Sequence, residues 1–306
     1  MANYYCMMAG AADISLADAK AAVSFADFKA ECEENLTPGD KQLLFYFYLR
    51  WDCMNIVRLL KAEDKQEKGE ARFSSAEQEQ GRTMPGNPEA ELEMIGNYNR
   101  DQYADMITSA RELTFNVHRY PAFMSIFIRE YNYNKEKPDF CAEDAMMFQY
   151  LTYCIAQCRN RMMKDWYRLN LNLDNILTAL IARRYGWNVA RYIQGDDEVT
   201  EMIRTNNSKD FDLSLEYDYV KDLMRIVEEP DPVRKEHGID AFKWLWLDEQ
   251  TFFDPFSIEA VFAYLCKLAM LRRWEKLDPQ QGRETFEHII NDLRGEAKVP
   301  AEFVRK

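Results

Sequence analysis

Acidic residues grouped on one predicted helix are the first in this chain that could do chemistry. Residues 196–201 read Asp-Asp-Glu-Val-Thr-Glu, which approaches the Asp-Asp-x-x-Asp pattern with which helical prenyl-transfer and terpene enzymes hold magnesium. Threonine occupies the last position, Thr200, and no second acidic motif accompanies it. A solvated acidic helix start after Gly195 is therefore favoured, because carboxylates stabilise the positive end of a helix. Asp212 and Glu216 form a second pair one turn apart, which would suit a glycosidase only beside a cleft.

Metal-binding and nucleophilic patterns are absent from the sequence. Cys154 and Cys158 lie four residues apart on one predicted helix face, but a zinc site requires two further ligands, so buried thiols are favoured. Neither a phosphate-binding glycine loop nor a Gly-x-Ser-x-Gly nucleophile motif occurs. The three histidines are isolated from one another: His118, His237 and His288. We therefore expect no catalytic residue, no metal site and no cofactor, and predict that the chain is not an enzyme.

The overall charge restricts the class of partner. The 306 residues carry a net charge of −13, whereas nucleic-acid binding requires a basic surface that displaces counterions. Anionic lipid would repel the chain for the same reason, so direct insertion into lipid is not expected. The longest apolar stretch, residues 258–271, contains Glu259 and Lys267 and is too short to span a bilayer. Seven cysteines without an export signal indicate reduced thiols, and we expect a cytoplasmic protein.

Helix signals dominate the chain and predict an all-α fold. Thr37-Pro38 supplies a cap followed by a proline at the first helical position, and Gly186 ends a segment whose apolar residues recur at three- and four-residue spacing. The cap-then-proline pattern recurs at three further places: Asp231-Pro232, Asp254-Pro255 and Asp278-Pro279. Residues 63–87 are rich in Glu, Gln, Lys, Gly and Ser, which predicts a mobile loop within the first domain.

Two segments of the chain share an internal repeat. Residues 52–62 and 172–182 each carry an acidic or amide residue, then Asn-Ile three residues later, then leucine and alanine. A degenerate third copy begins at Asp254 and contains Ser257 and Ile258. Chance similarity between amphipathic helices is the alternative, although periodicity alone does not require the Asn-Ile pair. The matched residues are Asp52, Asn55 and Ile56 in the first copy and Asn172, Asn175 and Ile176 in the second.

The asparagine of each copy is the residue that needs an explanation. Asparagine is unfavourable inside a helix because its side chain competes with the backbone for hydrogen bonds. Asn55 and Asn175 therefore either bind a neighbouring helix end or carbonyl, or they face solvent, and the sequence leaves both alternatives open.

The second copy lies in a longer segment that resembles a known family. Residues 170–186, including Arg183, look like a characteristic line of the C-type (also called d-type) subunit of V-type rotary ATPases. The first copy matches the same line, and residues 254–267, including Tyr264, are similar to the family's third repeat. The chain also looks like an uncharacterised bacterial family encoded beside V-type ATPase genes. The sequence departs from the family's pattern in two places. The residues that continue the third repeat differ from those of the family, and the polar loop predicted at residues 63–87 has no counterpart in it.

The resemblance implies three similar helical domains around a pseudo-threefold axis, forming a funnel. We place these domains at residues 1–120, 121–230 and 231–306. In that family the wide mouth receives the central stalk, and the base sits on the proteolipid ring at the cytoplasmic face of the membrane. The implied role is a non-catalytic connector that transmits torque for proton or other ion transport, or for ATP synthesis. A helical protein-interaction scaffold unrelated to the ATPase is the alternative, and a helical enzyme is disfavoured by the missing sites.

Overall fold

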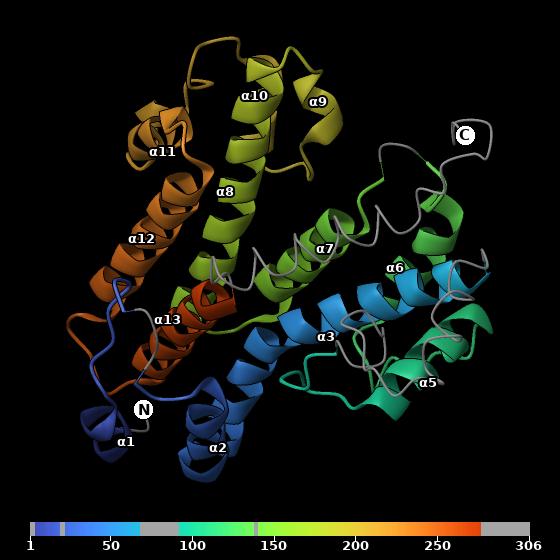
Figure 1. Ribbon diagram of the computed structural model, residues 1–306, viewed down its shortest axis with the longest axis vertical. Coiled ribbons are helices and arrows are strands. Elements are labelled where there is room, and N and C mark those ends of the chain that lie inside the picture. The colour runs from blue at the N-terminus through green and yellow to red at the C-terminus, as the bar shows by residue number, and fades with distance from the viewer. Residues whose placement is uncertain (1–3, 19–21, 68–91, 138–139, 277–306) are drawn as a thin grey trace, which may run out of the picture. The chain divides into compact units, whose positions relative to one another are not determined.

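The computed structural model describes residues 4–18, 22–67, 92–137 and 140–276 (Figure 1). All regular secondary structure within these ranges is helical, which confirms the predicted all-α class. The chain forms two compact units, one of Met1–Leu36 with Asp240–Lys306 and the other of Thr37–Ile239. Within the described ranges, none of the helices combines the length and the apolar composition needed to cross a membrane.

The expected domain boundaries relate differently to these two units. Residue 120 falls inside the larger unit, whereas residue 230 directly precedes α12 (Pro232–Thr251), the helix along which the chain passes from one unit to the other. Asp231 accepts a hydrogen bond from the Val233 N–H at 2.9 Å, so α12 starts at the predicted cap-then-proline signal. The division into three similar domains around one axis stays a prediction.

The larger unit contains the helices that position most of the repeat residues. Their bounds are α3 (Pro38–Glu67), α5 (Arg100–Arg111), α6 (Ala122–Asn134), α7 (Ala142–Gln157), α8 (Arg161–Arg184), α9 (Val189–Tyr192), α10 (Glu198–Thr205), the 3-10 helix η1 (Leu213–Leu215) and α11 (Val220–Glu228). Helix α7 packs against both α3 and α8, and α5 packs against α6. Helices α9, α10 and α11 each contact α8. The two copies of the repeat therefore lie on α3 and α8, with α7 in contact with both (Figure 1).

Apolar side chains at helical spacing form the core between α3, α7 and α8. Each fully buried aliphatic or aromatic side chain contributes about 1.5–3 kcal/mol relative to an exposed one. Cys154 and Cys158 are both buried, which confirms that they are core thiols. The buried set includes Leu49, Cys53, Ile56 and Leu60 on α3, Met146, Tyr150 and Cys154 on α7, and Leu173, Ile176 and Ala179 on α8.

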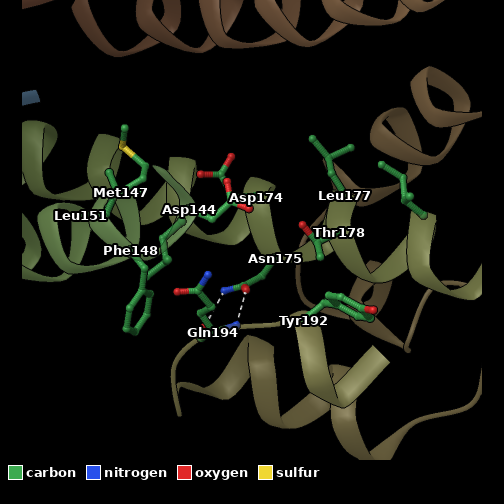
Figure 2. Close-up of a pocket in the computed structure, with 12 residues that line it drawn as sticks. Asp144, Met147, Phe148, Leu151, Asp174, Asn175, Leu177, Thr178, Tyr192 and Gln194 are labelled. Carbon is green, nitrogen blue, oxygen red and sulfur yellow. Dashed lines mark hydrogen bonds between the residues drawn. The ribbon is translucent and has the colours of Figure 1, made fainter. Parts of the chain in front are cut away.

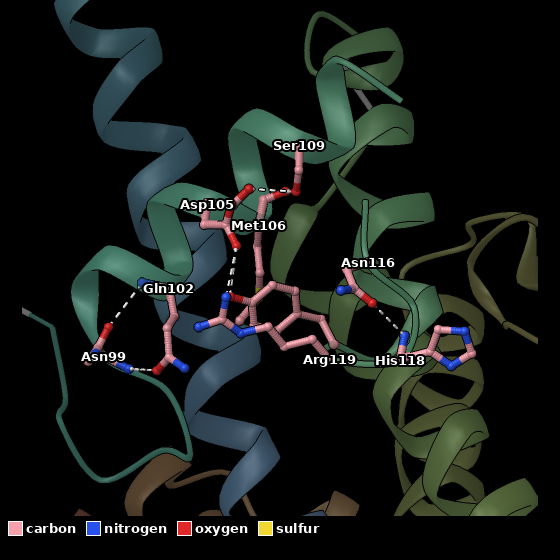
Figure 3. A network of polar contacts seen from close by, with 9 residues as sticks. Asn99, Gln102, Asp105, Met106, Ser109, Asn116, His118 and Arg119 are labelled. Carbon is pink, nitrogen blue, oxygen red and sulfur yellow. Dashed lines mark hydrogen bonds and ion pairs between the residues drawn. The ribbon is translucent and has the colours of Figure 1, made fainter. Parts of the chain in front are cut away.

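Side-chain caps fix where several of these helices begin and end. Asn99 and Gln102 cap each other's backbone at the start of α5: Asn99 accepts from the Gln102 N–H at 3.0 Å, and Gln102 accepts from the Asn99 N–H at 2.9 Å (Figure 3). Thr37 accepts from the Asp40 N–H at 3.3 Å, so α3 starts at the predicted Thr37-Pro38 signal. The predicted stop is also confirmed, because Gly186 follows α8 with a φ of 69°.

Helix α3 extends further than the sequence predicted. Residues 63–67 belong to this helix, so the prediction that a loop begins at residue 63 is wrong. Contacts with neighbouring helices hold the polar last turn in place: Glu63 pairs with Arg111 at 2.6 Å, and Asp64 accepts from the Tyr131 hydroxyl at 2.5 Å. The remainder of the predicted loop, residues 68–87, lies outside the described residues.

The smaller unit places the third copy of the repeat on a different set of helices. It contains α1 (Tyr5–Gly10), α2 (Phe25–Asn35), the part of α12 from Asp240 onward, and α13 (Ile258–Lys276). The rings of Phe28 on α2 and Tyr264 on α13 lie 4.5 Å apart between centroids, and the Tyr264 hydroxyl donates to the Ala12 carbonyl at 2.9 Å. Asp240 accepts from Arg273 at 2.6 Å and so joins α12 to α13.

Candidate functional site

Asn55 holds the backbone of a segment far away in the sequence. It lies in the middle of α3 and is fully buried. Its Nδ2 donates to the Glu93 carbonyl at 2.9 Å, and its Oδ1 accepts from the Glu93 N–H at 3.1 Å. The solvent-facing alternative is therefore wrong, and the prediction that Asn55 binds a neighbouring carbonyl is confirmed. We call this reciprocal pairing of one asparagine side chain with one residue's backbone an asparagine clamp.

The Asp52 carboxylate lies one turn before this clamp and organises the adjoining turn. Its Oδ2 accepts from the backbone N–H and the side-chain Nδ2 of Asn97, at 2.9 and 2.8 Å. Its Oδ1 accepts from the Tyr103 hydroxyl at 2.6 Å and from the Tyr98 N–H at 3.2 Å. Gly96 packs directly against the carboxylate, because a Cβ at that position would lie 2.0 Å from Asp52 Oδ1. The turn at residues 96–98 therefore depends on both the charge of Asp52 and the missing side chain of Gly96.

The electrostatics of this cluster follow from its burial. Burial raises the pKa of the Asp52 carboxyl above its ordinary value, while the hydrogen bonds from Tyr103, Asn97 and Tyr98 act in the opposite direction. Burial and the adjacent Asp52 carboxylate raise the pKa of the Tyr103 hydroxyl. Tyr103 consequently stays protonated and serves as a hydrogen-bond donor to Asp52. Tyr103 also accepts from Asn55 Nδ2 at 3.1 Å, which connects the carboxylate to the clamp.

The second copy of the repeat contains the same clamp. Asn175 is buried on α8; its Nδ2 donates to the Gln194 carbonyl at 2.9 Å, and its Oδ1 accepts from the Gln194 N–H at 2.8 Å (Figure 2). Gly195 follows with a φ of 99°, a conformation that favours glycine. Asn172, the counterpart of Asp52, is buried and hydrogen-bonds the Tyr219 side chain. The same reciprocal bonding at matched positions of the two copies supports the predicted repeat.

Arg183 stabilises a loop at the C-terminal end of α8. Its guanidinium donates to the carbonyls of Asn206, at 3.3 Å, and of Ser208. It also lies over the Phe211 ring, 3.8 Å from the centroid, which is a cation–π arrangement. Phe211 and Asp212 have φ values of 57° and 60°, which are unfavourable for residues with side chains. Arg183 therefore compensates for a strained loop and does not contact either clamp through these bonds.

The third copy of the repeat does not reproduce the clamp. Ser257 accepts from the Ala260 N–H at 3.2 Å and donates to the Asp254 carbonyl at 2.9 Å, so it caps the start of α13. Ile258 is partly exposed, whereas its counterparts in the first two copies are fully buried. The predicted helix start at Asp254-Pro255 is wrong, because these residues form a turn and the helix begins three residues later.

Sequence reasoning found the helical half of each clamp and missed its partners. Glu93 and Gln194 contribute backbone atoms only, so their side chains carry no signal of the pairing. A glycine follows each partner closely, as Gly96 and Gly195, and this was the available sign of a constrained turn. The tyrosine that meets the first residue of each copy, Tyr103 or Tyr219, was likewise missed.

The acidic stretch at residues 196–201 is a helix start, as predicted. Asp197 accepts from the Thr200 N–H at 2.9 Å and caps α10, and Asp196 pairs with Arg204 at 3.2 Å. Throughout the part of the chain that the structure describes, no group of three or more His, Cys, Asp or Glu residues is placed to hold a metal ion.

A surface pocket of about 320 Å³ lies between α7, α8 and the end of α9 (Figure 2). Phe148, Leu151 and Leu177 contribute apolar surface to it, and Asp144 and Asp174 contribute carboxylates. The second clamp forms part of its wall, because both of its residues also line the pocket. We call it the α7–α9 pocket. Its lining offers binding by apolar contact and by negative charge.

Three exposed aromatic side chains adjoin this pocket, and we call them the aromatic strip: Tyr185, Trp187 and Tyr192. The ring centroids of Tyr185 and Trp187 are 5.3 Å apart in a stacked arrangement, and those of Trp187 and Tyr192 are 5.7 Å apart. Tyr185 is 65% exposed and Trp187 is 53% exposed. Tyr192 also lines the α7–α9 pocket, so the strip and the pocket form one continuous surface.

Comparison with known proteins identifies a family. No curated protein matches the chain. No solved structure matches it either. The model of a family described as "Protein of unknown function (DUF2764)" matches residues 1–81 and 85–297. Because this match covers nearly the whole chain, the protein belongs to the DUF2764 family.

Proposed function

We propose that this chain is a non-catalytic connector of a V-type rotary ATPase, which joins the central stalk to the proteolipid ring and transmits torque between them. The observation that carries the proposal is the pair of asparagine clamps. They occupy matched positions in residues 52–62 and 172–182, the segments whose sequences resemble the connector subunit of V-type ATPases. A connector assembled from repeated helical domains would place the same contact at the same point of successive domains.

Mechanical stiffness is the property that these contacts supply. Torque transmission requires that helices keep their positions relative to the segments packed on them. Each clamp ties the middle of a long helix to a separate backbone segment by two hydrogen bonds, and burial strengthens such bonds. Arg183 adds a further tie at the end of α8. These contacts resist sliding at three points along α3 and α8.

The proposal also requires a specific arrangement and specific partners. It requires three similar domains around a pseudo-threefold axis, with a mouth that receives stalk subunits and a base that sits on the ring at the cytoplasmic face of the membrane. The net charge of −13 favours attachment through basic surfaces of these partner proteins, and disfavours anionic lipid and nucleic acid.

A helical interaction scaffold unrelated to the ATPase is the second candidate. The aromatic strip favours it, because contiguous exposed apolar surface is typical of protein-binding sites. Both candidates require protein partners. Only the connector requires that ATP hydrolysis lose its coupling to ion transport when the chain is removed.

The test compares inverted membrane vesicles from native cells with and without the gene for this chain. ATP-driven ion transport and ATP hydrolysis are measured on the same vesicles. We expect transport to fall to background on deletion, hydrolysis to persist in part, and re-expression of the chain to restore transport. Unchanged transport in the deletion strain would contradict the connector and leave the scaffold.

A second experiment identifies the partners directly. The tagged chain is purified from native membranes in mild detergent, and co-purifying proteins are quantified by mass spectrometry. Stalk and ring subunits should be recovered in stoichiometric amounts. The control is a tag on a known ATPase subunit; if that tag recovers the intact ATPase and the tagged chain recovers none of it, the proposal is wrong.

A further inference from the structure

The α7–α9 pocket and the aromatic strip together have the character of a protein-docking surface. We propose that this surface binds a short amphipathic segment of a partner protein, one that presents an apolar side chain flanked by Lys or Arg. The proposal concerns a local surface of the larger unit and holds for either candidate function. It therefore succeeds or fails independently of the connector.

The apolar part of the surface accounts for an inserted side chain. Phe148, Leu151 and Leu177 line a pocket of about 320 Å³, which is at the lower end of the size range of specific ligand pockets. Ile181, 38% exposed, extends this lining along α8 toward the strip. Large apolar and aromatic side chains gathered in this way are typical of the central part of a protein interface.

Charge determines which kind of segment fits. Among the described residues that line the pocket, the charged ones are Asp144, in the first turn of α7, and Asp174, on α8, and both are exposed. Two carboxylates beside an apolar pocket favour Lys or Arg next to the inserted side chain and disfavour an acidic segment. The aromatic strip lies beside the exposed Arg184 and Arg191, so the preference for a basic segment rests on the two carboxylates of the pocket.

The shape of the surface extends beyond what a small ligand would cover. The pocket lies between α7 and α8, whereas the strip continues past the end of α8 and along α9, from Tyr185 to Tyr192. An amphipathic helix laid along such a surface contacts it with side chains one turn apart. A protein segment therefore fits the whole surface better than a metabolite confined to the pocket.

The pocket wall is held in place before any partner binds. The clamp between Asn175 and Gln194 fixes the wall on the α9 side, and the Asn188 side chain caps α9 by accepting from the Ala190 N–H at 3.2 Å. A pre-formed site loses less conformational entropy on binding than one that must order itself.

The test uses two fluorescein-labelled amphipathic peptides of about 14 residues, long enough for roughly four helical turns. Both carry leucine and phenylalanine on one face; the polar face carries lysine in the basic probe and glutamate in the acidic probe. Binding to the full chain is measured by fluorescence anisotropy at low salt. Hydrogen exchange with mass spectrometry locates the protected segments. We expect the basic probe to bind and to protect residues 144–151 and 174–192, and the acidic probe not to bind.

Matched variants separate docking from general attraction to an acidic protein. The double variant Asp144→Asn/Asp174→Asn removes the two carboxylates that line the pocket, and we call it the rim variant. The control variant, Asp101→Asn/Asp218→Asn, removes two exposed carboxylates elsewhere on the larger unit. The rim variant should bind the basic probe about fivefold more weakly than the control variant.

The aromatic strip is tested by truncating its central ring. Trp187→Ala should weaken binding of the basic probe about tenfold, because aromatic anchors carry much of the binding energy of an interface. Phe253→Ala is the control, since it truncates a 93% exposed ring in the smaller unit, and it should leave binding unchanged.

The proposal is overturned by any one of three results. The first is equal binding of the acidic and basic probes. The second is equal binding of the basic probe to the rim variant and its charge-matched control. The third is protection that maps away from α7, α8 and α9. Helical circular dichroism of each variant confirms that these substitutions of exposed side chains leave the fold intact.

Discussion

The clusters around Asn55 and Asn175 use one device in two different surroundings. Asn55 is completely enclosed, and Tyr103 connects it to the buried Asp52 carboxylate. Asn175 makes the same two bonds with a backbone segment, but it also lines an open pocket. The clamp itself therefore determines only that a helix is bonded to a neighbouring backbone segment. What surrounds the clamp decides whether the region is closed core or the wall of a binding surface.

The residue before each clamp shows how the two surroundings differ chemically. Asp52 accepts four hydrogen bonds and fixes a turn in which position 96 has no space for a side chain, so glycine occupies it. Asn172 occupies the matched position without a charge and bonds Tyr219. A buried carboxylate requires several donors, so the first cluster is more strongly constrained than the second.

The largest expected effect comes from removing the enclosed clamp. Asn55→Leu leaves the N–H and carbonyl of Glu93 without their side-chain partners and should destabilise the chain by about 4 kcal/mol. Urea unfolding followed by circular dichroism measures the loss. Asn35→Leu is the control, because Asn35 is bonded within its own helix to the Glu31 carbonyl, and it should change stability by less than about 0.5 kcal/mol. Equal losses in the two variants would show that Asn55 is not a clamp.

The next effect tests the close approach at Gly96. Gly96→Ala forces a methyl group against the Asp52 carboxylate, which cannot move without breaking its hydrogen bonds, so we expect a loss of about 3 kcal/mol. Gly195→Ala, one residue after the second clamp's partner Gln194, meets the Phe148 ring at 3.3 Å and a positive φ, and should cost about 1–2 kcal/mol.

Thermal unfolding of these two glycine variants is compared with Gly10→Ala. A Cβ at Gly10 would meet nothing within 4 Å, so this control should unfold at the midpoint of the unmodified chain. If Gly195→Ala lowers the midpoint more than Gly96→Ala, the first cluster is not the more constrained of the two.

The clamp beside the pocket should matter less than the enclosed one. Asn175→Leu removes two hydrogen bonds to a partly exposed segment, so we expect a loss of about 2 kcal/mol in the larger unit. Asn170→Leu is the control on the same helix, where the side chain donates to the Trp166 carbonyl four residues earlier within that helix. An unchanged thermal midpoint in Asn175→Leu would remove the basis for comparing the two copies.

The smallest effect concerns pH and only the first cluster. Burial raises the pKa of Asp52 in the folded chain, so the folded state holds this proton more tightly than the unfolded state. The stability that protonation of Asp52 contributes is fully present below the pKa of this residue in the unfolded chain. It is lost as the pH rises through the pKa of Asp52 in the folded chain. Relative to Asp52→Asn, the unmodified chain should therefore lose stability as pH rises from about 4 toward neutrality.

Urea unfolding at a series of pH values measures this difference. Parallel curves for Asp52→Asn and the unmodified chain would contradict a raised pKa.

The sequence predicted the helical class, several helix ends and the two asparagines. These features depend on local chemistry: apolar spacing along α3 and α8, the Thr37 cap, and the glycine at position 186. The partners of the clamps were not predictable in the same way. Asn55 and Asn175 bind backbone atoms, which every residue has, so no side-chain pattern marks Glu93 or Gln194.

Tertiary contacts explain the errors as well. The last turn of α3 is too polar to predict as helix, yet Arg111 and Tyr131 hold it from neighbouring helices. The sequence Asp254-Pro255 has the pattern of a helix start, but the helix is capped by Ser257 and begins after it. The α7–α9 pocket arises from three separate helices, and its position therefore required the fold.

The two clamps also join very different lengths of chain, 38 residues apart in the first copy and 19 in the second. For a flexible connection, doubling the length adds only about 0.6 kcal/mol of closure entropy. Each clamp fixes the point at which the chain returns, whatever its path in between. A clamp therefore sets the spacing of its two partners in space independently of their separation in the sequence.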